Sequence, residues 1–326
     1  MTALSGFDIV TMSKNHSIKF TLLTACKNEE VDIRLAIESA LDQTHPNKEI
    51  IFVDDSTDRT PDIIREYANR GVILIDGPRK GCCQARNLGM QRATGDVIVF
   101  LTADTKLEPD YLEKIAPYYE GGYDWVVVDS LSFNLENVYS RFVEMQQRAK
   151  EKNPKFSPWT TQGYSVRRDA ALAVGMISGG VYPVNFCRDW SLGKKLEEHR
   201  YKKIFDRSIA VPHKSPDNFP EYWIVRKTRG LMSAYQPYFM FHESPFRMLC
   251  RFAAKSVLEF LRFVLIIPAA WHVAEAARES TKHSFRDFFL FYYAYFIQQL
   301  ARVVGEWQGW LYIWRHSRTH RPLVAA

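Results

Sequence analysis

The chain has 326 residues, of which 46% are hydrophobic and 25% are charged, enough for one large or two medium domains with buried cores. Its five cysteines show no paired or metal-type spacing, which favours a reducing compartment. Residues 1–17 lack the basic-then-apolar layout of a signal peptide. These features disfavour a secreted protein, and we expect a cytoplasmic one.

The net charge of +6 is unevenly distributed along the chain. Residues 221–326 carry 14 Lys and Arg against 7 Asp and Glu, together with five of the eight Trp. A basic, aromatic C-terminal third predicts a surface for anionic lipid headgroups. A helical subdomain with a solvated basic face is the alternative.

The first hundred residues alternate short apolar runs with amphipathic ones. The pattern predicts strands at 18–25, 49–55, 72–77 and 96–104, and helices at 30–43, 60–71 and 82–95. Alternation of this kind with short connections predicts an α/β fold, a mostly parallel sheet covered by helices. Ligands of such sheets bind outside the carboxyl ends of the strands, so the polar residues there are the candidate site.

The regularity weakens after residue 110, where a strand at 124–133 and a helix at 137–152 are predicted. Two long aromatic segments follow, at 248–277 and 285–316. Charged residues interrupt both before they reach the roughly 20 apolar residues that a membrane span needs. We therefore expect a C-terminal region of amphipathic helices that lie on a membrane surface without crossing it.

Polar clusters follow the predicted strands in order. They read "TACKNEE" (24–30), "VDDSTDRT" (53–60), "GPRKGCCQARNLG" (77–89) and "LTADT" (101–105), with "CRDW" (187–190) far downstream. Asp54 or Asp55 can accept hydrogen bonds from a nucleotide base and from ribose hydroxyls. Arg86 can offer a planar fork to a base carbonyl or to a phosphate.

In this order and spacing, the clusters resemble the family 2 glycosyltransferases, which have the GT-A fold. The resemblance covers residues 18–213. The family's "NE", "VDDGSTDGT", "G…ARN.G" and "LDADD" elements are matched by Asn28-Glu29, Asp54-Asp55-Ser56-Thr57-Asp58, Gly81 with Ala85-Arg86-Asn87, and Thr102-Ala103-Asp104. The later "G…RR" and "ED..L" elements look matched by Gly163–Arg167–Arg168 and by Arg188-Asp189-Trp190-Ser191-Leu192.

The resemblance implies a set of residues that bind a nucleotide-sugar. These are Thr24, Ala25, Asn28, Glu29, Asp54, Asp55, Gly81, Arg86, Asn87, Thr102, Ala103 and Asp104. It also implies that Asp189 is the general base that takes a proton from the acceptor hydroxyl. From the local sequence alone, the interpretation of Asp189 as the N-cap of the helix that follows is favoured, and the resemblance favours the general base instead.

The chain departs from the family pattern in three places. The Gly of the family's "DDGS" is absent, Arg188 stands where the family has Glu, and Thr102 replaces the first Asp of the metal motif. Mg²⁺ often takes one or two protein carboxylates and completes its shell with phosphate and water. Asp104, helped by His213, is therefore the predicted ligand set for a divalent metal, Mg²⁺ or Mn²⁺.

The segment "WIVRKTRG" (223–230) stands where processive relatives carry Gln-x-x-Arg-Trp, which this chain lacks. Its absence favours transfer of a single sugar over polymer synthesis. Arg226 and Arg229 of this segment are candidates to clamp a diphosphate or a lipid phosphate, and a solvated basic helix face is the alternative.

These observations predict an N-terminal extension at 1–16, a GT-A domain at 17–222 and a helical region for the membrane interface or oligomerisation at 223–326. The expected activity is inverting transfer from a nucleotide-sugar, with a UDP-sugar favoured, to a lipid phosphate or lipid-linked glycan at the cytoplasmic membrane face.

Three alternatives remain open. In the first, the acceptor is soluble or a polysaccharide, and the C-terminal helices form a homo-oligomer interface. In the second, the chain is an inactive scaffold that binds a nucleotide-sugar. The third, a dinucleotide dehydrogenase, is disfavoured because no G-x-G-x-x-G follows the first strand. No nucleic acid partner is expected.

Overall fold

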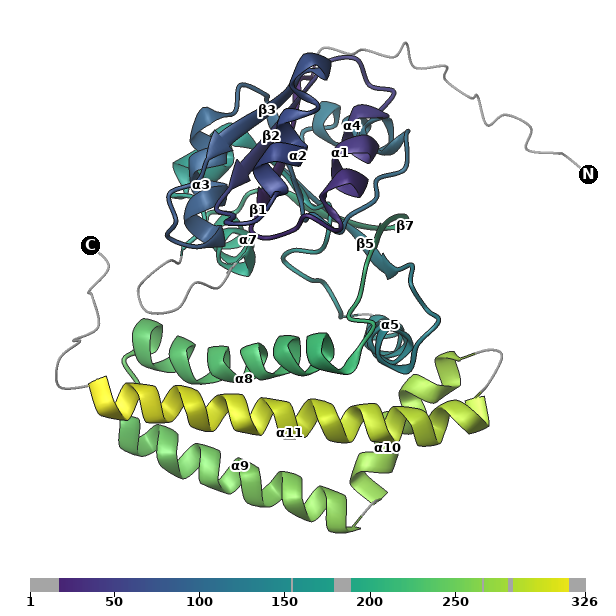
Figure 1. Ribbon diagram of the computed structural model, residues 1–326, viewed down its shortest axis with the longest axis vertical. Coiled ribbons are helices and arrows are strands. Elements are labelled where there is room, and N and C mark those ends of the chain that lie inside the picture. Colours follow the sequence, from purple (N-terminus) through teal and green to yellow (C-terminus); the bar gives the residue numbers. More distant parts are fainter. Residues whose placement is uncertain (1–17, 154, 179–188, 266, 281–283, 317–326) are drawn as a thin grey trace, which may run out of the picture.

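The computed structural model describes residues 18–153, 155–178, 189–265, 267–280 and 284–316. The extension predicted at 1–16 and the departure at Arg188 lie outside these residues. The described chain forms a sheet domain above a layer of long helices (Figure 1). Seven strands make one sheet in the order β3-β2-β1-β4-β6-β5-β7. Their bounds are β1 Phe20–Cys26, β2 Lys48–Asp54, β3 Val72–Asp76, β4 Val97–Leu101, β5 Trp125–Ser132, β6 Ser165–Arg167 and β7 Lys203–His213.

The half of the sheet that contains β1 to β4 is parallel, as predicted. Cys26 at the end of β1 is paired with Asp54 at the end of β2, and Asp54 with Asp76 at the end of β3. Thr24 of β1 is paired with Leu101, the last residue of β4. This register brings the loops that follow the four strands to one edge of the sheet. Short β6 is antiparallel to both of its neighbours, β4 and β5, and β7 returns parallel to β5.

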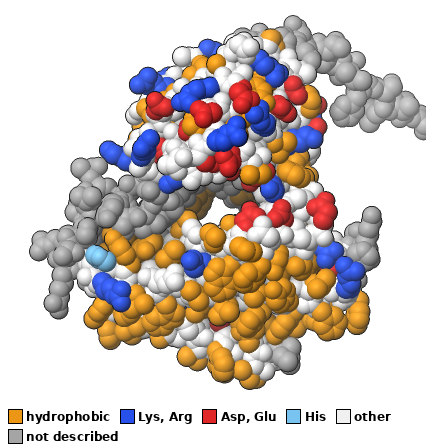
Figure 2. Space-filling model, viewed as in Figure 1, with side chains coloured by type: hydrophobic (Ala, Val, Ile, Leu, Met, Phe, Trp, Pro, Cys, Tyr) orange, Lys and Arg blue, Asp and Glu red, His pale blue; other side chains and the backbone are white. Residues whose placement is uncertain are grey.

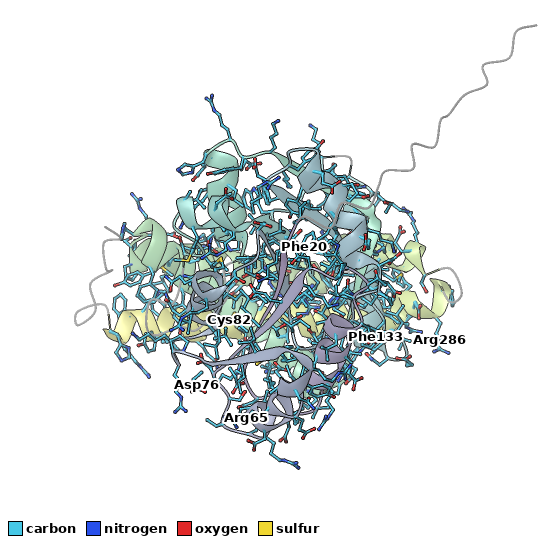
Figure 3. The ribbon with its side chains drawn as sticks, turned by 90° about the horizontal axis from the view of Figure 1, so that it is seen from above. Phe20, Arg65, Asp76, Cys82, Phe133 and Arg286 are labelled. Atoms are coloured by element: carbon cyan, nitrogen blue, oxygen red, sulfur yellow. The ribbon has the colours of Figure 1, made fainter. Side chains whose placement is uncertain are left out.

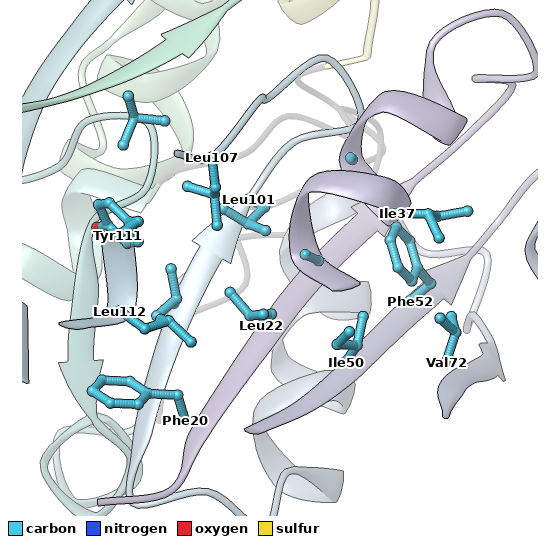
Figure 4. Packing of buried hydrophobic residues seen from close by; sticks show 14 of the residues in the cluster. Phe20, Leu22, Ile37, Ile50, Phe52, Val72, Leu101, Leu107, Tyr111 and Leu112 are labelled. Carbon is cyan, nitrogen blue, oxygen red and sulfur yellow. The ribbon is translucent and has the colours of Figure 1, made fainter. Parts of the chain in front are cut away.

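Helices cover both faces of the sheet because the buried strands are apolar on both sides. Along β1, Phe20 and Leu22 point into one core and Leu23 into the other. Figure 4 shows the first of these cores, where Phe20, Leu22 and Phe52 pack beneath the helices. That face carries α1 (Ile33–Leu41), α2 (Thr60–Arg65) and α4 (Tyr111–Glu120), and the other carries α3 (Cys82–Arg92), α6 (Arg168–Ala173) and α7 (Asp189–Glu198).

Below the sheet lie the helices of the helical layer. They are α8 (Phe219–Phe241), α9 (Pro245–Leu265), α10 (Ile267–Glu279) and α11 (Ser284–His316), and α5 (Val138–Glu151) packs against α10 and α11. Seen from above, the sheet domain sits over the middle of this layer (Figure 3). Helix α8 begins at Phe219, so the predicted boundary at residue 223 falls inside a helix. Helix α5, which precedes that boundary in sequence, belongs by its packing to the helical layer.

Helices α8 and α11 run parallel and in close contact. A Cβ atom placed on Gly230 would lie 2.1 Å from the carbonyl oxygen of Arg302, and one on Gly305 would lie 2.1 Å from that of Lys227. Glycine at both positions therefore lets the two backbones touch. This contact also brings the side chains of Arg226 and Arg302 into the lining of one cavity.

The basic residues of the C-terminal third are not all on the surface, contrary to the expected basic face. Arg226 is 2% exposed, and it shares an interior cavity with Lys255, Arg262 and Arg302. The close contact of α8 and α11 at Gly230 and Gly305 explains part of this burial, because it brings Arg226 of α8 and Arg302 of α11 into one cavity.

Among the described helices, none alone has the length and hydropathy of a membrane span. Helix α9 and the stretch Ala269–Glu279 together have the length and hydropathy of a span, but they are bent by 71° at the break between them.

We predict that Gly230→Ala lowers the midpoint of thermal unfolding, because the new methyl group must push α11 away from α8. Overpacking of this kind costs about 1–3 kcal/mol. Ser233→Ala, three residues later on α8, is the control, since its hydroxyl bonds only the carbonyl of Arg229 on its own helix. Circular dichroism measures the midpoint of thermal unfolding of both variants. An unchanged midpoint for Gly230→Ala would show that the close contact of α8 and α11 is not tight.

Candidate functional site

Three adjoining cavities run from the carboxyl edge of the sheet into the helical layer. The strand-edge cavity, about 590 Å³, lies at the ends of β1, β2 and β4. The middle cavity, about 330 Å³, shares Arg86, Thr102 and Gln162 with it. The helical cavity, about 470 Å³, shares Gln146, Lys150, Arg226 and Arg229 with the middle one. Many of the residues predicted to bind substrate therefore line one connected path.

Of the two neighbouring acids at the end of β2, Asp55 faces the strand-edge cavity. Its Oδ1 accepts a hydrogen bond of 2.7 Å from the backbone N–H of Arg79, which leaves its other carboxylate oxygen for a ligand. Asp54 is turned inward, where it accepts a hydrogen bond of 2.5 Å from Ser56 and one of 3.3 Å from the Cys26 thiol. Asp54 therefore supports the loop, and Asp55 is the acid placed to meet a base or a ribose.

The predicted residue Asn28 joins the loops after β1 and β2. Its backbone N–H donates to Ser56 Oγ at 2.7 Å, and its Oδ1 accepts from the N–H of Thr57 at 2.9 Å. The backbone of Asn28 is left-handed, with φ of 59°, a conformation that Asn tolerates better than most residues. Asn28 thus shapes the cavity without belonging to the described residues that line it.

Glu29, next along the chain, does line the strand-edge cavity. Burial raises its pKa to about 7, and the negative charges of Asp104, Asp32, Asp58 and Glu221 add to the effect. The cavity therefore contains more negative charge than its own basic side chains neutralise.

The "LTADT" segment ends β4 at the border of the strand-edge and middle cavities. The hydroxyl of Thr102 donates a short hydrogen bond to Asp104 Oδ1, and it also lies 2.8 Å from Thr105 Oγ1 and 3.1 Å from Gln162 Oε1. Thr102 thus occupies the place of an acid but orients Asp104 instead of adding a second charge. Ala103 is buried in the same wall.

His213, at the end of β7, lies beside this segment. Its backbone forms a bridge with Thr105, and its Nδ1 is 3.1 Å from Ser130 Oγ. Burial lowers the pKa of His213, although the neighbouring charge of Asp104 opposes the shift. The imidazole is thus favoured in the neutral form that a metal ligand requires.

These residues fit a divalent metal only as a partial ligand set. Among the described residues, no group of three or more His, Cys, Asp or Glu side chains is arranged to hold a metal. Asp104 and His213 supply two donors, and the acidity around Glu29 favours a cation there. A diphosphate entering this acidic cavity would provide the remaining oxygen ligands, as is usual for Mg²⁺.

Arg86 and Asp189 form an ion pair between α3 and the start of α7. Arg86 is 5% exposed, and its guanidinium lies 5.9 Å from the centre of the Phe100 ring. Asp189 is the first residue of α7, where the helix dipole favours its charged form. The pair stands in the wall of the middle cavity, so the predicted base lies where that cavity meets the strand-edge cavity.

Several other predicted residues have supporting positions. The Asn87 amide exchanges two hydrogen bonds with the backbone of Ile177, of 2.9 and 3.1 Å, and so holds the loop after α6. Thr24 is buried inside β1, away from the lining of the strand-edge cavity, whereas Ala25 lines it. Gly81 also lines it, with φ of 91°, a conformation that other residues rarely adopt. Its place at the start of α3 brings the chain close to the cavity.

The structure adds residues that sequence reasoning did not select. Arg79, Gln162, Lys214 and Glu221 line the strand-edge cavity. Glu221 comes from the first turn of α8, and Lys214 is held by Asp32 at 3.2 Å. Lys214 immediately follows the predicted ligand His213, and that adjacency was the available signal. Arg226 and Arg229, selected as phosphate ligands, line the middle and helical cavities.

Comparison with known proteins agrees with this geometry. Residues 21–171, just under half of the chain, match the sequence model described as Glycosyl transferase family 2. Over these residues the chain is similar to glycosyl transferase family 2. The match contains the strand-edge cavity's loops after β1, β2 and β4, so the predicted resemblance to this family is confirmed.

Two curated relatives illustrate how much of the chain is matched. The chain is 42% identical over 98 residues to EpsH of Bacillus subtilis (strain 168), a protein assigned to the glycosyltransferases, covering 29% of this chain and 28% of that protein. It is 29% identical over 170 residues to the glycosyltransferase AglE of Haloferax volcanii, covering 47% and 55%. The chain thus spans well under two thirds of the relatives' length.

Among solved structures, the mannosyltransferase PcManGT of Pyrobaculum calidifontis matches with a TM-score of 0.57 at 16% identity, over 91% of this chain and 89% of that one. Residues 1–349 of S. aureus TarS match with a TM-score of 0.50 at 12% identity, over 93% of each chain. At these identities the likeness establishes the fold. The predicted GT-A fold, with its mostly parallel sheet and additional helices, is confirmed.

The raised pKa of Glu29 predicts a pH-dependent stability. An acid with a pKa near 7 in the folded state and an ordinary value of 4.5 disfavours folding once it is ionised. We therefore expect Glu29→Gln to raise the unfolding midpoint at pH 8 in the presence of a chelator. The difference from the unsubstituted protein should shrink as the pH falls from 7 toward 5.

Glu120→Gln, at the exposed end of α4, is the matched control and should show no such trend. Thermal unfolding at several pH values measures both variants. A stabilisation by Glu29→Gln that does not change with pH would contradict the assigned cause.

Proposed function

We propose that the protein is an inverting glycosyltransferase that moves a single sugar from a nucleotide-sugar to a lipid phosphate or lipid-linked glycan at the cytoplasmic membrane face. The observation that carries the proposal is the position of Asp189. It lies in the middle cavity, which adjoins the strand-edge cavity through Arg86, Thr102 and Gln162. A sugar donor on one side and an acceptor hydroxyl on the other would meet beside this carboxylate.

The donor is proposed to occupy the strand-edge cavity. Asp55 would accept hydrogen bonds from the base or ribose, and Arg79 and Lys214 would face the diphosphate. The solved relatives support a nucleotide-sugar: TarS has been solved in complex with UDP-GlcNAc, and PcManGT with GDP-Man and Mn²⁺. A UDP-sugar is the first donor to test.

In the proposed reaction, the acceptor hydroxyl attacks the anomeric carbon from the side opposite the diphosphate. Asp189 takes the hydroxyl proton, the new glycosidic bond forms, and the bond to the diphosphate breaks with its electron pair leaving on that group. A divalent metal held by Asp104 and His213 would neutralise charge on the departing diphosphate. Arg86 lines both cavities and pairs with Asp189, so it is placed to hold the carboxylate until the diphosphate competes for the guanidinium.

We expect Asp189→Asn to lower turnover by about 10²-fold or more while the affinity for nucleoside diphosphate stays nearly unchanged, because the amide cannot accept the proton. Asp62→Asn, an acid in the first turn of the distant helix α2, is the control. Steady-state rates and calorimetric binding separate the two effects. Turnover near that of the unsubstituted protein would place the base elsewhere.

Membrane docking is proposed from the outward face of α9. Val257, Phe260, Val264 and Leu265 are 58–66% exposed, whereas Glu259 on the same helix is 6% exposed. Lys255 pairs with Glu306, and Arg262 with Glu259, within the protein. From Lys255 to Leu265, helix α9 therefore directs charged groups inward and apolar groups outward, the reverse of a helix that faces water.

The exposed apolar surface continues beyond α9. Trp271 of α10 and Phe285, Phe289 and Trp314 of α11 are also exposed. Figure 2 shows hydrophobic side chains gathered over the helical layer, whereas the sheet domain above has a mixed, charged surface. Trp is typical of the membrane–water interface, which supports a lipid surface as the partner of this face.

We expect Phe260→Glu/Val264→Glu to abolish most flotation with vesicles of phosphatidylglycerol and phosphatidylcholine, because two charges would enter the hydrocarbon boundary. Gln91→Glu on α3 adds charge away from this face and should float normally. Since several cations lie inside the protein, high salt should release only part of the bound protein.

Sedimentation without lipid tests the alternative that the same face joins two copies. If the unsubstituted protein ignores the vesicles and Phe260→Glu/Val264→Glu instead dissociates an oligomer, the membrane proposal is wrong.

A further inference from the structure

The helical cavity is formed by five helices at the centre of the helical layer. Its polar lining comes from α5 (Gln146, Lys150), α8 (Arg226, Arg229), α9 (Lys255, Glu259, Arg262), α10 (His272, Glu275) and α11 (Gln298, Gln299, Arg302). Basic groups outnumber acidic ones in this lining. The assigned reaction steps use none of these side chains.

Two of the acids in and around this cavity are already paired. Glu259 pairs with Arg262, and Glu306 with Lys255. No carboxylate of the described residues forms an ion pair with Arg226, Arg229 or Arg302. The Nε atoms of Arg226 and Arg302 are buried and have no hydrogen-bond partner within the described part of the chain. Guanidinium groups left in this way bind an anion favourably, because burying an unpaired charge is costly.

Burial and the positive charges of Arg226, Arg229 and Arg302 lower the pKa values of basic groups beside them. Arg229 is accessible through the cavities, yet burial together with Arg226 and Arg302 lowers its pKa to about 10. Burial, followed by the charges of Arg229, Arg226 and Arg302, lowers the pKa of Lys150. Three helices distant in sequence thus place like charges close enough to repel one another. A bound anion would relieve that repulsion.

The position of the cavity indicates which anion it receives. Gln146, Lys150, Arg226 and Arg229 line both the helical and the middle cavities, and Asp189 lies in the middle one. The strand-edge cavity for the donor is on the other side of Arg86 and Thr102. An anion in the helical cavity is therefore on the acceptor's side of the proposed base.

The opening of the cavity is also informative. His272 and Glu275 are exposed members of its lining on α10, and the indole of Trp271 donates to Glu275 at 3.1 Å. Trp271 itself belongs to the exposed apolar surface described above. A chain carrying a phosphate could therefore enter from the side that is proposed to meet lipid.

We propose that the helical cavity binds the phosphate or diphosphate group of the sugar acceptor, held by Arg226, Arg229 and Arg302. The assignment to the acceptor rests on the proposed function, in which Asp189 is the base. Guanidinium groups suit this ligand because each offers a planar fork of donors to phosphate oxygens. The acceptor's reacting hydroxyl would then extend from the anion toward Asp189.

The test uses full-length protein, inorganic pyrophosphate as the probe and a chelator to exclude metal. We expect Arg302→Gln to weaken pyrophosphate binding about tenfold or more, the loss expected for charge-assisted hydrogen bonds. Arg302→Lys should retain part of the affinity. Lys227→Gln, on α8 but outside the cavity lining, should bind as the unsubstituted protein does.

Stability distinguishes an anion site from a structural arginine. Without pyrophosphate, Arg302→Gln should raise the unfolding midpoint, because it removes a half-buried positive charge whose Nε has no hydrogen-bond partner in the described part of the chain. Pyrophosphate should raise the midpoint of the unsubstituted protein more than that of the variant. Equal pyrophosphate affinity in both proteins would overturn the proposal, as would a lowered midpoint with an unchanged response to pyrophosphate.

Two further arms identify the source of the phosphate and separate this proposal from the proposed function. Phosphatidylcholine vesicles containing phosphatidic acid should bind in a manner that depends on Arg302 if the phosphate is carried by a lipid. Pyrophosphate binding that depends on Arg302 without such vesicle binding assigns the site to a soluble phosphorylated acceptor.

Hydrolysis of the sugar donor by water needs no acceptor, so it tests the glycosyltransferase activity separately from the anion site. Absence of any donor turnover in the unsubstituted protein would count against the glycosyltransferase activity and against placing the anion on its acceptor. The pyrophosphate arm still decides whether the anion site exists.

Discussion

Parallel pairing of β3, β2, β1 and β4 is the constraint on which the arrangement of this protein depends. Parallel strands end at the same edge, and the register that joins Cys26 to Asp54 and Thr24 to Leu101 keeps the loops after them in contact. Asp55, Arg86 and Asp104 meet there although they are far apart in sequence. The antiparallel insertion of β6 and the return of β7 then bring His213 to the same edge.

The second organising feature is the inverted polarity of the helical layer. Close contact of α8 with α11 at Gly230 and Gly305 places guanidinium groups in an interior cavity, while α9 turns its apolar side outward. Both features are costly for an isolated protein in water, the first through unpaired charge and the second through exposed apolar area. A ligand that combines an anionic group with a hydrocarbon chain would compensate both at once. The acceptor and membrane proposals therefore support each other.

The sequence predicted the sheet, the strand-end loops and the family because these depend on local pattern. Spacing could not tell Asp55, which faces the cavity, from Asp54, which bonds to Ser56, since adjacent residues differ only in the direction of their side chains. The sequence singled out Arg226 and Arg229 as candidate phosphate ligands, but it gave no sign that Lys150 and Arg302 lie beside them. These residues come from three helices, and the glycine contacts that pack α8 against α11 join positions distant in sequence.

The central claim is that donor and acceptor groups occupy opposite ends of one connected path, with Asp189 between them. A structure of the full chain with a nucleoside diphosphate and Mn²⁺ tests it most directly. The account predicts the nucleotide in the strand-edge cavity, with its base or ribose at Asp55 and its diphosphate near Asp104. Nucleotide bound against Arg226 and Arg302, or at the opposite edge of the sheet, would contradict it.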